Sequence, residues 1–241
     1  MSYQSTLEAL KQAYLPVEQN TVELGAHAGL VIVDIVKGFA EVGHGPLAPP
    51  TENAQVTRMI DETNRLAKDF IHRERPILAF LDTHVPEKEE PPYPPHCEIG
   101  TGHENFVDAL AWLDKEPSVK QIRKDCINGY IGAEAANGQN AFVHWIREHQ
   151  IEQLIVVGIC TDICVMDFVL TTLSARNHGM LGSVRDVIVY EPACATYDLS
   201  AETITQLDLP ITATHPQEIT HHVGLYLMAS RGAIIAKHLI N

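Results

Sequence analysis

The sequence predicts an α/β protein with three layers, helices on both faces of a mostly parallel central sheet. Apolar runs of strand length alternate along the chain with longer segments of helical periodicity. Two proline-rich loops, 43–50 and 86–95, each follow the end of a predicted strand, which is where open α/β sheets place their ligand sites. The 241 residues are enough for one large domain with a substantial core.

The predicted strands are short apolar runs, and the predicted helices are amphipathic segments. A long helix is expected over 53–73, because apolar residues recur there at helical spacing from Val56 to Phe70. Gly179 is expected to end the last central helix. The strands are expected at 29–36, 76–82, 119–123, 154–159 and 186–190, and the further helices at 104–113, 139–149 and 162–177.

We expect a single domain over residues 1–241, with extensions at both ends. Residues 1–25 form a predicted N-terminal helical extension. Residues from about 200 to 241 form a C-terminal extension packed on the domain. In this second extension, 209–212 is a strand-like piece, and 215–238 reads as one or two helices.

Composition excludes several classes of function. A net charge of −14 argues against binding to nucleic acid or to an anionic membrane surface. The apolar runs are too short to span a bilayer, and the N-terminus lacks the pattern of a signal peptide, so a cytoplasmic protein is expected. Five cysteines without a C-x-x-C pair fit free thiols in a reducing compartment.

The segment that most strongly indicates a catalytic residue is 154–170, with the sequence LIVVGICTDICVMDFVL. A buried strand ends at Gly158, a tight turn follows, and Thr161 or Asp162 is suited to cap the next helix. Cys164 would lie in the first turn of that helix, where the helix dipole favours a thiolate and can lower the thiol pKa from about 8.5. Cys164 is therefore the candidate nucleophile, with a buried structural cysteine as the alternative.

Two charged residues at predicted strand ends could serve such a nucleophile. Asp34 is the only charged residue in the apolar run 29–36, and apolar surroundings raise a carboxyl pKa toward the range useful for proton transfer. A turn or capping role is the alternative. Lys124 would hold the thiolate and Asp34 ionised, although the pattern leaves Lys120 and Arg123 open as rivals.

A second group of residues suggests a metal site. Asp82 and His84 stand two apart at a strand end, and His96 follows the proline-rich loop. One carboxylate and two imidazoles suit a first-row divalent metal with open coordination positions. Glu89 is the expected fourth ligand, with Glu87 or Glu90 as alternatives, and zinc is the expected ion, with iron or manganese also compatible. The alternative is a solvated, purely polar strand end.

Together, Asp34, Lys124 and Cys164 in GICTDIC resemble the Asp–Lys–Cys triad of the isochorismatase-like cysteine hydrolases over about residues 29–198. DTH at 82–84 and PPHC at 94–97 resemble the metal site of nicotinamidases within that superfamily. KDCINGYIGA and HPQEITHHVGLYLMASRGA resemble the longer, plant-type nicotinamidase sequences.

The resemblance implies the isochorismatase-like hydrolase fold and hydrolysis of nicotinamide to nicotinate and ammonia in NAD salvage. The Cys164 thiolate would form a thioester, and the backbone N–H groups of Cys160 and Cys164 would bind the oxyanion beside a cis Ile159–Cys160 peptide bond. The metal would bind the pyridine nitrogen. By the same resemblance, the substrate would contact Phe39, Tyr93, Tyr130 and Ile159.

Two other functions stay open from the sequence. One is a metal-independent amidohydrolase of the same superfamily that acts on a carbamoyl or ureido compound. The other is a non-catalytic binding or scaffold subunit, which would have no need for the intact triad. A small-molecule substrate and a homo-oligomer are the expected partners, without nucleic acid or membrane.

Overall fold

A seven-stranded sheet forms the centre of the computed structural model, which describes residues 3–88, 90–91, 93–206 and 210–241. All neighbouring strands run parallel, in the order β1-β7-β6-β5-β2-β3-β4. The strands are β1 (Asn20–Glu23), β2 (Ala28–Val33), β3 (Ile77–Asp82), β4 (Val119–Lys124), β5 (Gln153–Ile159), β6 (Asp186–Ala195) and β7 (Ile234–Ile240).

Helices connect these strands and cover both faces of the sheet. The α-helices are α1 (Tyr3–Ala9), α2 (Lys37–Ala40), α3 (Ala54–His72), α4 (Gly129–Gly132), α5 (Ala141–Glu148), α6 (Cys164–Asn177), α7 (Ala201–Gln206) and α8 (Gln217–Ala229). The other helical segments are a π-helical turn, η1 (Leu10–Tyr14), and two 3₁₀ segments, η2 (Asp108–Lys115) and η3 (Ile211–Ala213).

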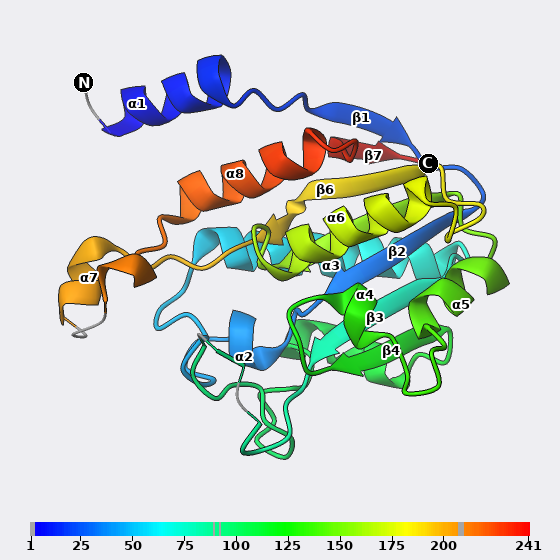
Figure 1. Ribbon diagram of the computed structural model, residues 1–241, viewed down its shortest axis with the longest axis horizontal. Coiled ribbons are helices and arrows are strands. Elements are labelled where there is room, and N and C mark those ends of the chain that lie inside the picture. The colour runs from blue at the N-terminus through cyan, green and yellow to red at the C-terminus, as the bar shows by residue number, and fades with distance from the viewer. Residues whose placement is uncertain (1–2, 89, 92, 207–209) are drawn as a thin grey trace.

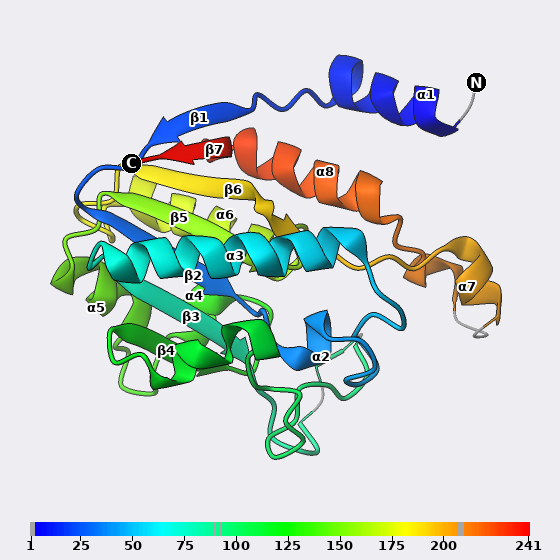
Figure 2. The ribbon, with the colours of Figure 1, turned by 180° about the vertical axis from the view of Figure 1, so that it is seen from behind.

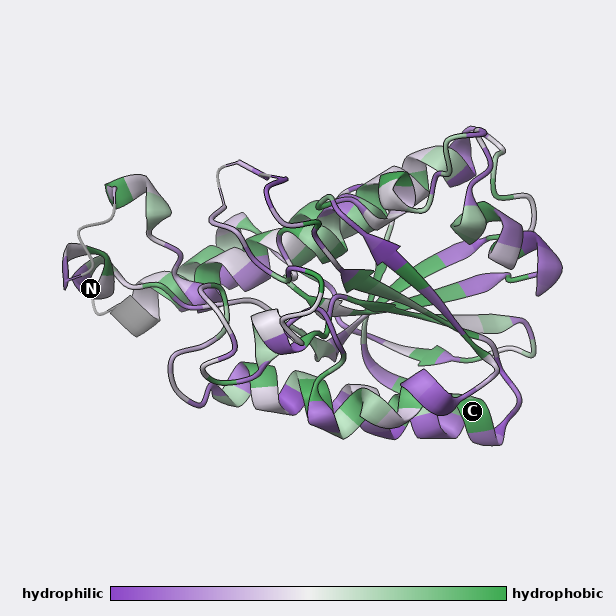
Figure 3. Ribbon diagram, turned by 90° about the horizontal axis from the view of Figure 1, so that it is seen from below, coloured by the Kyte–Doolittle hydropathy of each residue, from purple (hydrophilic) through white to green (hydrophobic). Residues whose placement is uncertain are grey.

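The predicted three-layer α/β fold with a mostly parallel sheet is confirmed (Figure 1). One face of the sheet packs against α5, α6 and α8, in a cluster that includes Phe142, Phe168 and Met228. The opposite face packs against α3 and η2, with Phe70 and Leu110 in its cluster, and α3 lies across that face in Figure 2. The inner strands are mostly hydrophobic in Figure 3, whereas the helices carry both hydrophobic and polar residues, as amphipathic elements between core and solvent must.

The inner part of the sheet follows the sequence prediction, and the ends of the chain do not. The five expected strands correspond to β2 to β6. The predicted helix at 104–113 is instead a 3₁₀ segment, η2, that starts at Asp108. In the C-terminal region, Leu209 lies outside the described residues, η3 replaces the expected strand-like piece, and the segment after α8 is strand β7 rather than helix. The N-terminal region also contains a strand, β1, beside its helical turns.

The two ends of the chain meet at one edge of the sheet. β1 pairs with β7, and β7 pairs with β6. His222 on α8 also forms a hydrogen bond with the carbonyl oxygen of Leu15, 2.8 Å away, so the terminal segments contact each other outside the sheet. None of the described helices is both long and apolar enough to cross a membrane.

The central strands bring the predicted site residues to one edge of the sheet. Asp34 follows β2 directly, while Asp82 and Lys124 end β3 and β4 and are partners in the strand register. Gly158 allows β5 to approach β2 closely, because a Cβ atom there would lie 2.1 Å from the carbonyl oxygen of Val33. Its φ of 137° also suits glycine far better than other residues. The turn between β5 and α6, residues 160–163, which leads to the candidate nucleophile Cys164 and is called the nucleophile turn below, is thereby placed beside Asp34.

Candidate active site

A buried ion pair lies at the centre of the site. The Nζ atom of Lys124 lies 2.8 Å from Oδ2 of Asp34, and both side chains are fully buried. The same ammonium group donates to Oδ1 of Asp82 at 3.0 Å and to the carbonyl oxygen of Cys126 at 2.9 Å. Lys120 is exposed and Arg123 donates to Thr83 and to the Glu104 carbonyl, so of the three candidates it is Lys124 that contacts Asp34.

Asp34 has the properties expected of a proton acceptor. Burial raises its pKa to about 6, although the charge of Lys124 opposes the shift and the side chain of Cys164 lowers the pKa through a hydrogen bond. The backbone of Asp34 has a φ of 53°, in the left-handed region that aspartate enters more readily than most residues. A carboxylate with a pKa near 6 is largely ionised at neutral pH and can both accept and return a proton.

Cys164 begins α6, as predicted, but its thiol pKa differs from the expectation. Burial raises this pKa well above its usual value, while the nearby charge of Lys124 lowers it. The sequence prediction of a lowered pKa at the helix N-terminus was therefore wrong for the free protein, because the thiol is enclosed rather than exposed to solvent. In this arrangement, Cys164 needs an acceptor for its proton during attack, and Asp34 is in contact with it.

The turn between β5 and α6 adopts the geometry that the family resemblance implied. The Ile159–Cys160 peptide bond is cis. The carbonyl oxygen of Cys160 accepts hydrogen bonds from the N–H groups of Ile163 and Val165, both at 3.1 Å, which closes the turn against the first residues of α6. The expected side-chain cap is not formed: the residue before α6 is Ile163, and the side chains of Thr161 and Asp162 contact two histidines instead.

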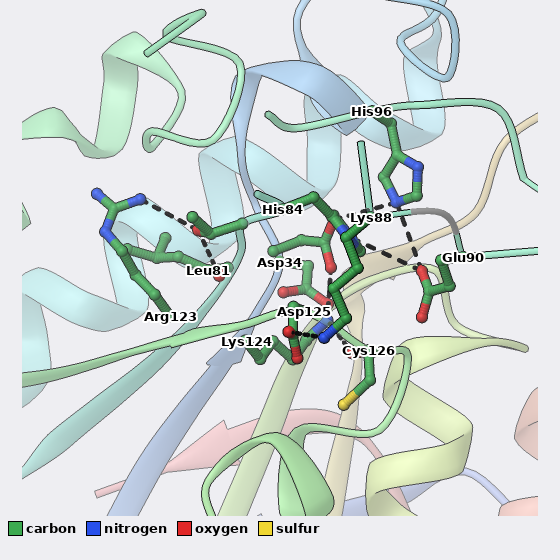
Figure 4. Close-up of polar contacts among 12 residues, drawn as sticks. Asp34, Leu81, His84, Lys88, Glu90, His96, Arg123, Lys124, Asp125 and Cys126 are labelled. Atoms are coloured by element: carbon green, nitrogen blue, oxygen red, sulfur yellow. Dashed lines mark hydrogen bonds and ion pairs between the residues drawn. The ribbon is translucent and has the colours of Figure 1, made fainter. Parts of the chain in front are cut away.

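A second cluster, formed by Asp82, His84 and His96, lies directly beside Lys124. One donor atom from each of its three buried side chains lies within 4.8 Å of the others. Nε2 of His84 is 3.0 Å from Oδ2 of Asp82, and Nε2 of His96 is 3.2 Å from the same oxygen (Figure 4). Burial alone would raise the pKa of Asp82, but Lys124 and the two imidazoles hold it far below its usual range.

The donor set of this cluster fits a divalent metal. Nδ1 of His96 lies 2.8 Å from the carbonyl oxygen of Pro94, which leaves Nε2, facing Asp82 and Glu90, as the ring nitrogen that could bind a metal ion. Such a hydrogen bond to the second ring nitrogen is typical of histidine ligands. An ionised carboxylate and two imidazoles with converging donors are ligands that zinc and related ions prefer.

A carboxylate of the proline-rich loop lies beside this cluster. Oε2 of Glu90 lies 3.7 Å from Nε2 of His84 and 3.6 Å from Nε2 of His96, as Figure 4 shows. Glu89, the expected fourth ligand, lies outside the described residues. Glu87 is exposed. Of the three glutamates weighed from the sequence, Glu90 is therefore the one that the described structure brings to the cluster.

Aromatic side chains surround His96. The rings of Phe39 and Tyr93 lie 5.5 Å and 6.1 Å from its ring, between centroids. Burial, with smaller contributions from the nearby Cys160 and Cys164, raises the pKa of Tyr93 to about 12, so its hydroxyl lies near the turn between β5 and α6. Ile159 is buried at the end of β5. Tyr130 packs edge-on against Phe142 within the core, with 5.7 Å between centroids.

The structure adds residues that sequence reasoning missed. Tyr197 lies near the nucleophile turn, because its ring stacks on His215, which contacts Asp162, and burial raises the pKa of its hydroxyl above the usual range. His215 and His221 contact the turn directly, through Asp162 and Thr161. In the sequence, this region stands out only through the resemblance of HPQEITHHVGLYLMASRGA to plant-type nicotinamidases, which does not indicate a contact with the turn.

Comparisons with known proteins agree with this architecture. The isochorismatase domain family matches residues 28–209. Nicotinamidase 1 of Arabidopsis thaliana is 46% identical over 241 residues, covering 99% of this chain and 98% of that protein. Two solved structures share the fold: nicotinamidase of Bacillus subtilis (TM-score 0.63, 20% identity, 88% of this chain and 99% of that one) and pyrazinamidase of Pyrococcus horikoshii in complex with zinc (TM-score 0.62, 19% identity, 87% and 98%).

The family match covers the strands and turns that carry the triad and the metal-binding cluster. It ends before α8 and β7, which the long relative from Arabidopsis covers as well. The isochorismatase fold, the parallel sheet and the extent of the match lead to one conclusion: this chain belongs to the isochorismatase family.

Proposed function

We propose that this protein is a nicotinamidase, which hydrolyses nicotinamide to nicotinate and ammonia. The observation that carries the proposal is the full-length similarity to Nicotinamidase 1, together with the contact between Asp34, Lys124 and Cys164 at the strand ends. A role in NAD salvage follows from the reaction, because its product, nicotinate, is a carboxylate precursor of NAD.

The geometry supports nucleophilic attack by Cys164. As its sulfur bonds to the carboxamide carbon, the thiol proton passes to Asp34, whose pKa of about 6 suits this transfer. Lys124 stays protonated between two carboxylates and keeps Asp34 in place. The buried, neutral thiol thus becomes a thiolate only as its proton is taken up.

Backbone groups of the nucleophile turn stabilise the charge that develops on the substrate oxygen. The N–H groups of Cys160 and Cys164 are the proposed donors, and the loss of one such donor typically lowers kcat by about 10²–10³-fold. Asp34 then returns its proton to the departing nitrogen, and ammonia leaves. A water molecule attacks the thioester with Asp34 again as the base, which releases nicotinate and restores the Cys164 thiol.

Asp82, His84 and His96 are the proposed ligands of a divalent metal ion, with zinc as the expected ion and Glu90 as a further ligand. A bound metal ion would supply a Lewis-acid contact for the pyridine nitrogen of the substrate. Phe39 and Tyr93 would then lie against the substrate ring, since both rings flank His96. These contacts orient the carboxamide toward Cys164, which favours reaction through alignment.

An ammonia-release assay on nicotinamide tests the proposal. The wild-type protein, loaded with zinc, should release one ammonia and one nicotinate for each nicotinamide. Cys164→Ala should abolish release while the far-ultraviolet circular dichroism spectrum stays that of the folded protein. A wild type that hydrolyses carbamoyl or ureido compounds but not nicotinamide, and that does so without metal, would contradict the proposal.

A further inference from the structure

The turn that carries the nucleophile is bound to the C-terminal segment by two consecutive side chains. The hydroxyl of Thr161 lies 2.8 Å from Nδ1 of His221, and the carboxylate of Asp162 lies 2.8 Å from Nε2 of His215. Both histidines are buried. Thr161 and Asp162 lie between the two proposed oxyanion donors, so contacts that hold these side chains restrain the backbone that connects Cys160 to Cys164.

His215 is itself held firmly in place. Its Nδ1 atom donates to the carbonyl oxygen of Tyr197 at 2.9 Å, and its ring stacks on the Tyr197 ring with 3.8 Å between centroids. Its backbone N–H and carbonyl groups form a pair of hydrogen bonds with Leu199, at 2.8 and 2.9 Å. The histidine therefore connects the chain after β6 to Asp162 through a rigid set of contacts.

The polarity of these contacts indicates a charged pair. Nδ1 of His215 faces a carbonyl oxygen and Nε2 faces a carboxylate, and both of these groups only accept hydrogen bonds. Both ring nitrogens therefore carry protons, and the imidazolium charge neutralises Asp162 beside the nucleophile turn. A partly buried pair of this kind is strong when both partners are present, and costly when one is removed.

The helix α8 supports the same turn by direct packing. A Cβ atom at Gly224 would lie 2.9 Å from the Cα atom of Asp162, so the helix backbone approaches the turn closely. Helix α8 lies beside α6 in Figure 1, and His221 and Gly224 are both on it. The region that includes His215, His221 and Gly224 lies beyond residue 209, where the match to the isochorismatase domain ends.

We propose that His215 and His221 are positioning residues that hold the backbone N–H groups of Cys160 and Cys164 in the geometry needed for the oxyanion. The C-terminal segment is then part of the framework of the active site rather than a covering layer. The expected effect on kcat rests on the proposed function, whereas the expected restraint of the turn rests on the hydrogen bonds alone.

The test compares His215→Ala and Thr161→Val with His222→Gln in the full-length, zinc-loaded protein. His222 is the matched control, since it is the neighbour of His221 on α8 but contacts Leu15 instead of the turn. His215→Ala should lower kcat for nicotinamide by about 10- to 100-fold, because small misplacements of reacting groups have effects of this size. KM should change by less than about 3-fold, since ground-state contacts are retained.

Two further measurements distinguish a positioning role of His215 from a general loss of stability in the variant. His215→Gln, which restores a neutral donor near the place of Nε2 but not the imidazolium charge, should recover part of the lost kcat. Hydrogen–deuterium exchange should show faster exchange over 160–167 in His215→Ala and in Thr161→Val, but not in His222→Gln. Thr161→Val keeps the side-chain shape, and it serves as the second variant if His215→Ala folds poorly.

An unchanged kcat in His215→Ala, an equal loss in His222→Gln, or unchanged exchange over 160–167 would each overturn the inference. A wild type without nicotinamidase activity would instead refute the proposed function. In that case the exchange data on the same variants still decide whether the two histidines hold the turn.

Discussion

The Nζ atom of Lys124 lies 3.0 Å from Oδ1 of Asp82, so the lysine of the triad is also a hydrogen-bond donor to the first proposed metal ligand. Its other carboxylate contact is Asp34, at 2.8 Å. Strand register explains this double role, because Lys124 and Asp82 are partners on neighbouring strands and Asp34 follows the next strand. A single buried charge, that of Lys124, therefore connects the proposed catalytic carboxylate Asp34 to the proposed metal-binding cluster.

Lys124→Met should abolish this coupling. The variant keeps the length of the side chain but leaves two buried carboxylates without their shared cation, so the free energy of unfolding should fall by about 3–5 kcal/mol. Ammonia release should fall at least about 100-fold, as Asp34 loses its position. Urea denaturation and the steady-state assay measure the two effects. Lys120→Met, at an exposed position of the same strand, is the control and should leave both quantities nearly unchanged.

Removal of Glu90 tests which loop carboxylate belongs to the metal-binding cluster. Glu90→Gln should weaken zinc binding by about 10- to 100-fold, because the carboxylate lies beside both imidazoles. A competition titration against a chromophoric chelator measures the affinity. Glu87→Gln, at an exposed position of the same loop, should bind zinc like the wild type. If Glu89→Gln weakens binding and Glu90→Gln does not, Glu89 is the ligand, as the sequence alone suggested.

His84→Ala tests whether the proposed metal site contributes to substrate binding rather than to the chemical step. Loss of this imidazole removes a proposed ligand, and with it the orienting contact for the substrate ring. The KM for nicotinamide should rise at least about 10-fold, and zinc content after dialysis should fall well below that of the wild type. An unchanged KM would show that the metal has no part in substrate binding.

The sequence predicted the central sheet because β2, β3 and β5 are buried on both faces and read as unbroken apolar runs. The same logic placed Asp34, Asp82 and Lys124 at strand ends. It missed β1, an edge strand whose residues alternate between half-buried and exposed, and β7, which lies between β1 and β6 and whose last four residues alternate in the same way. The contacts of His215 and His221 with the nucleophile turn join segments more than 50 residues apart, and no local pattern contains information about them.

Cys160→Ala should show that Cys160 acts through its backbone. Burial raises the pKa of its thiol to about 12, so the side chain stays neutral, and the Cys160 carbonyl group already holds the turn through Ile163 and Val165. Alanine keeps both backbone groups, and kcat should stay within about 3-fold of the wild-type value. A loss comparable to that of Cys164→Ala would assign the Cys160 thiol a chemical role.

Glu191 should make the stability of the C-terminal edge depend on pH. It lies 2.8 Å from Nζ of Lys237 on β7 and 3.7 Å from Nε2 of His221 on α8. Burial would raise its pKa, but hydrogen bonds and charges from His221 and Lys237 lower it to about 2. Because the folded-state pKa lies below the unfolded value, this contribution is complete above about pH 5 and is lost as the pH falls toward 2.

Glu191→Gln isolates this contribution from those of the other acidic groups. At pH 7 the variant should be less stable than the wild type by about 2 kcal/mol, a value reduced from the full pKa shift because Lys237 is partly exposed to solvent. Urea denaturation at a series of pH values measures the difference in free energy of unfolding between the wild type and the variant. This difference should shrink by more than half between pH 5 and pH 3, since pH 3 lies about one unit above the folded-state pKa of Glu191. A difference that stays constant over that range would mean that Glu191 contributes by packing alone, and that its charge does not connect β6 to β7 and α8.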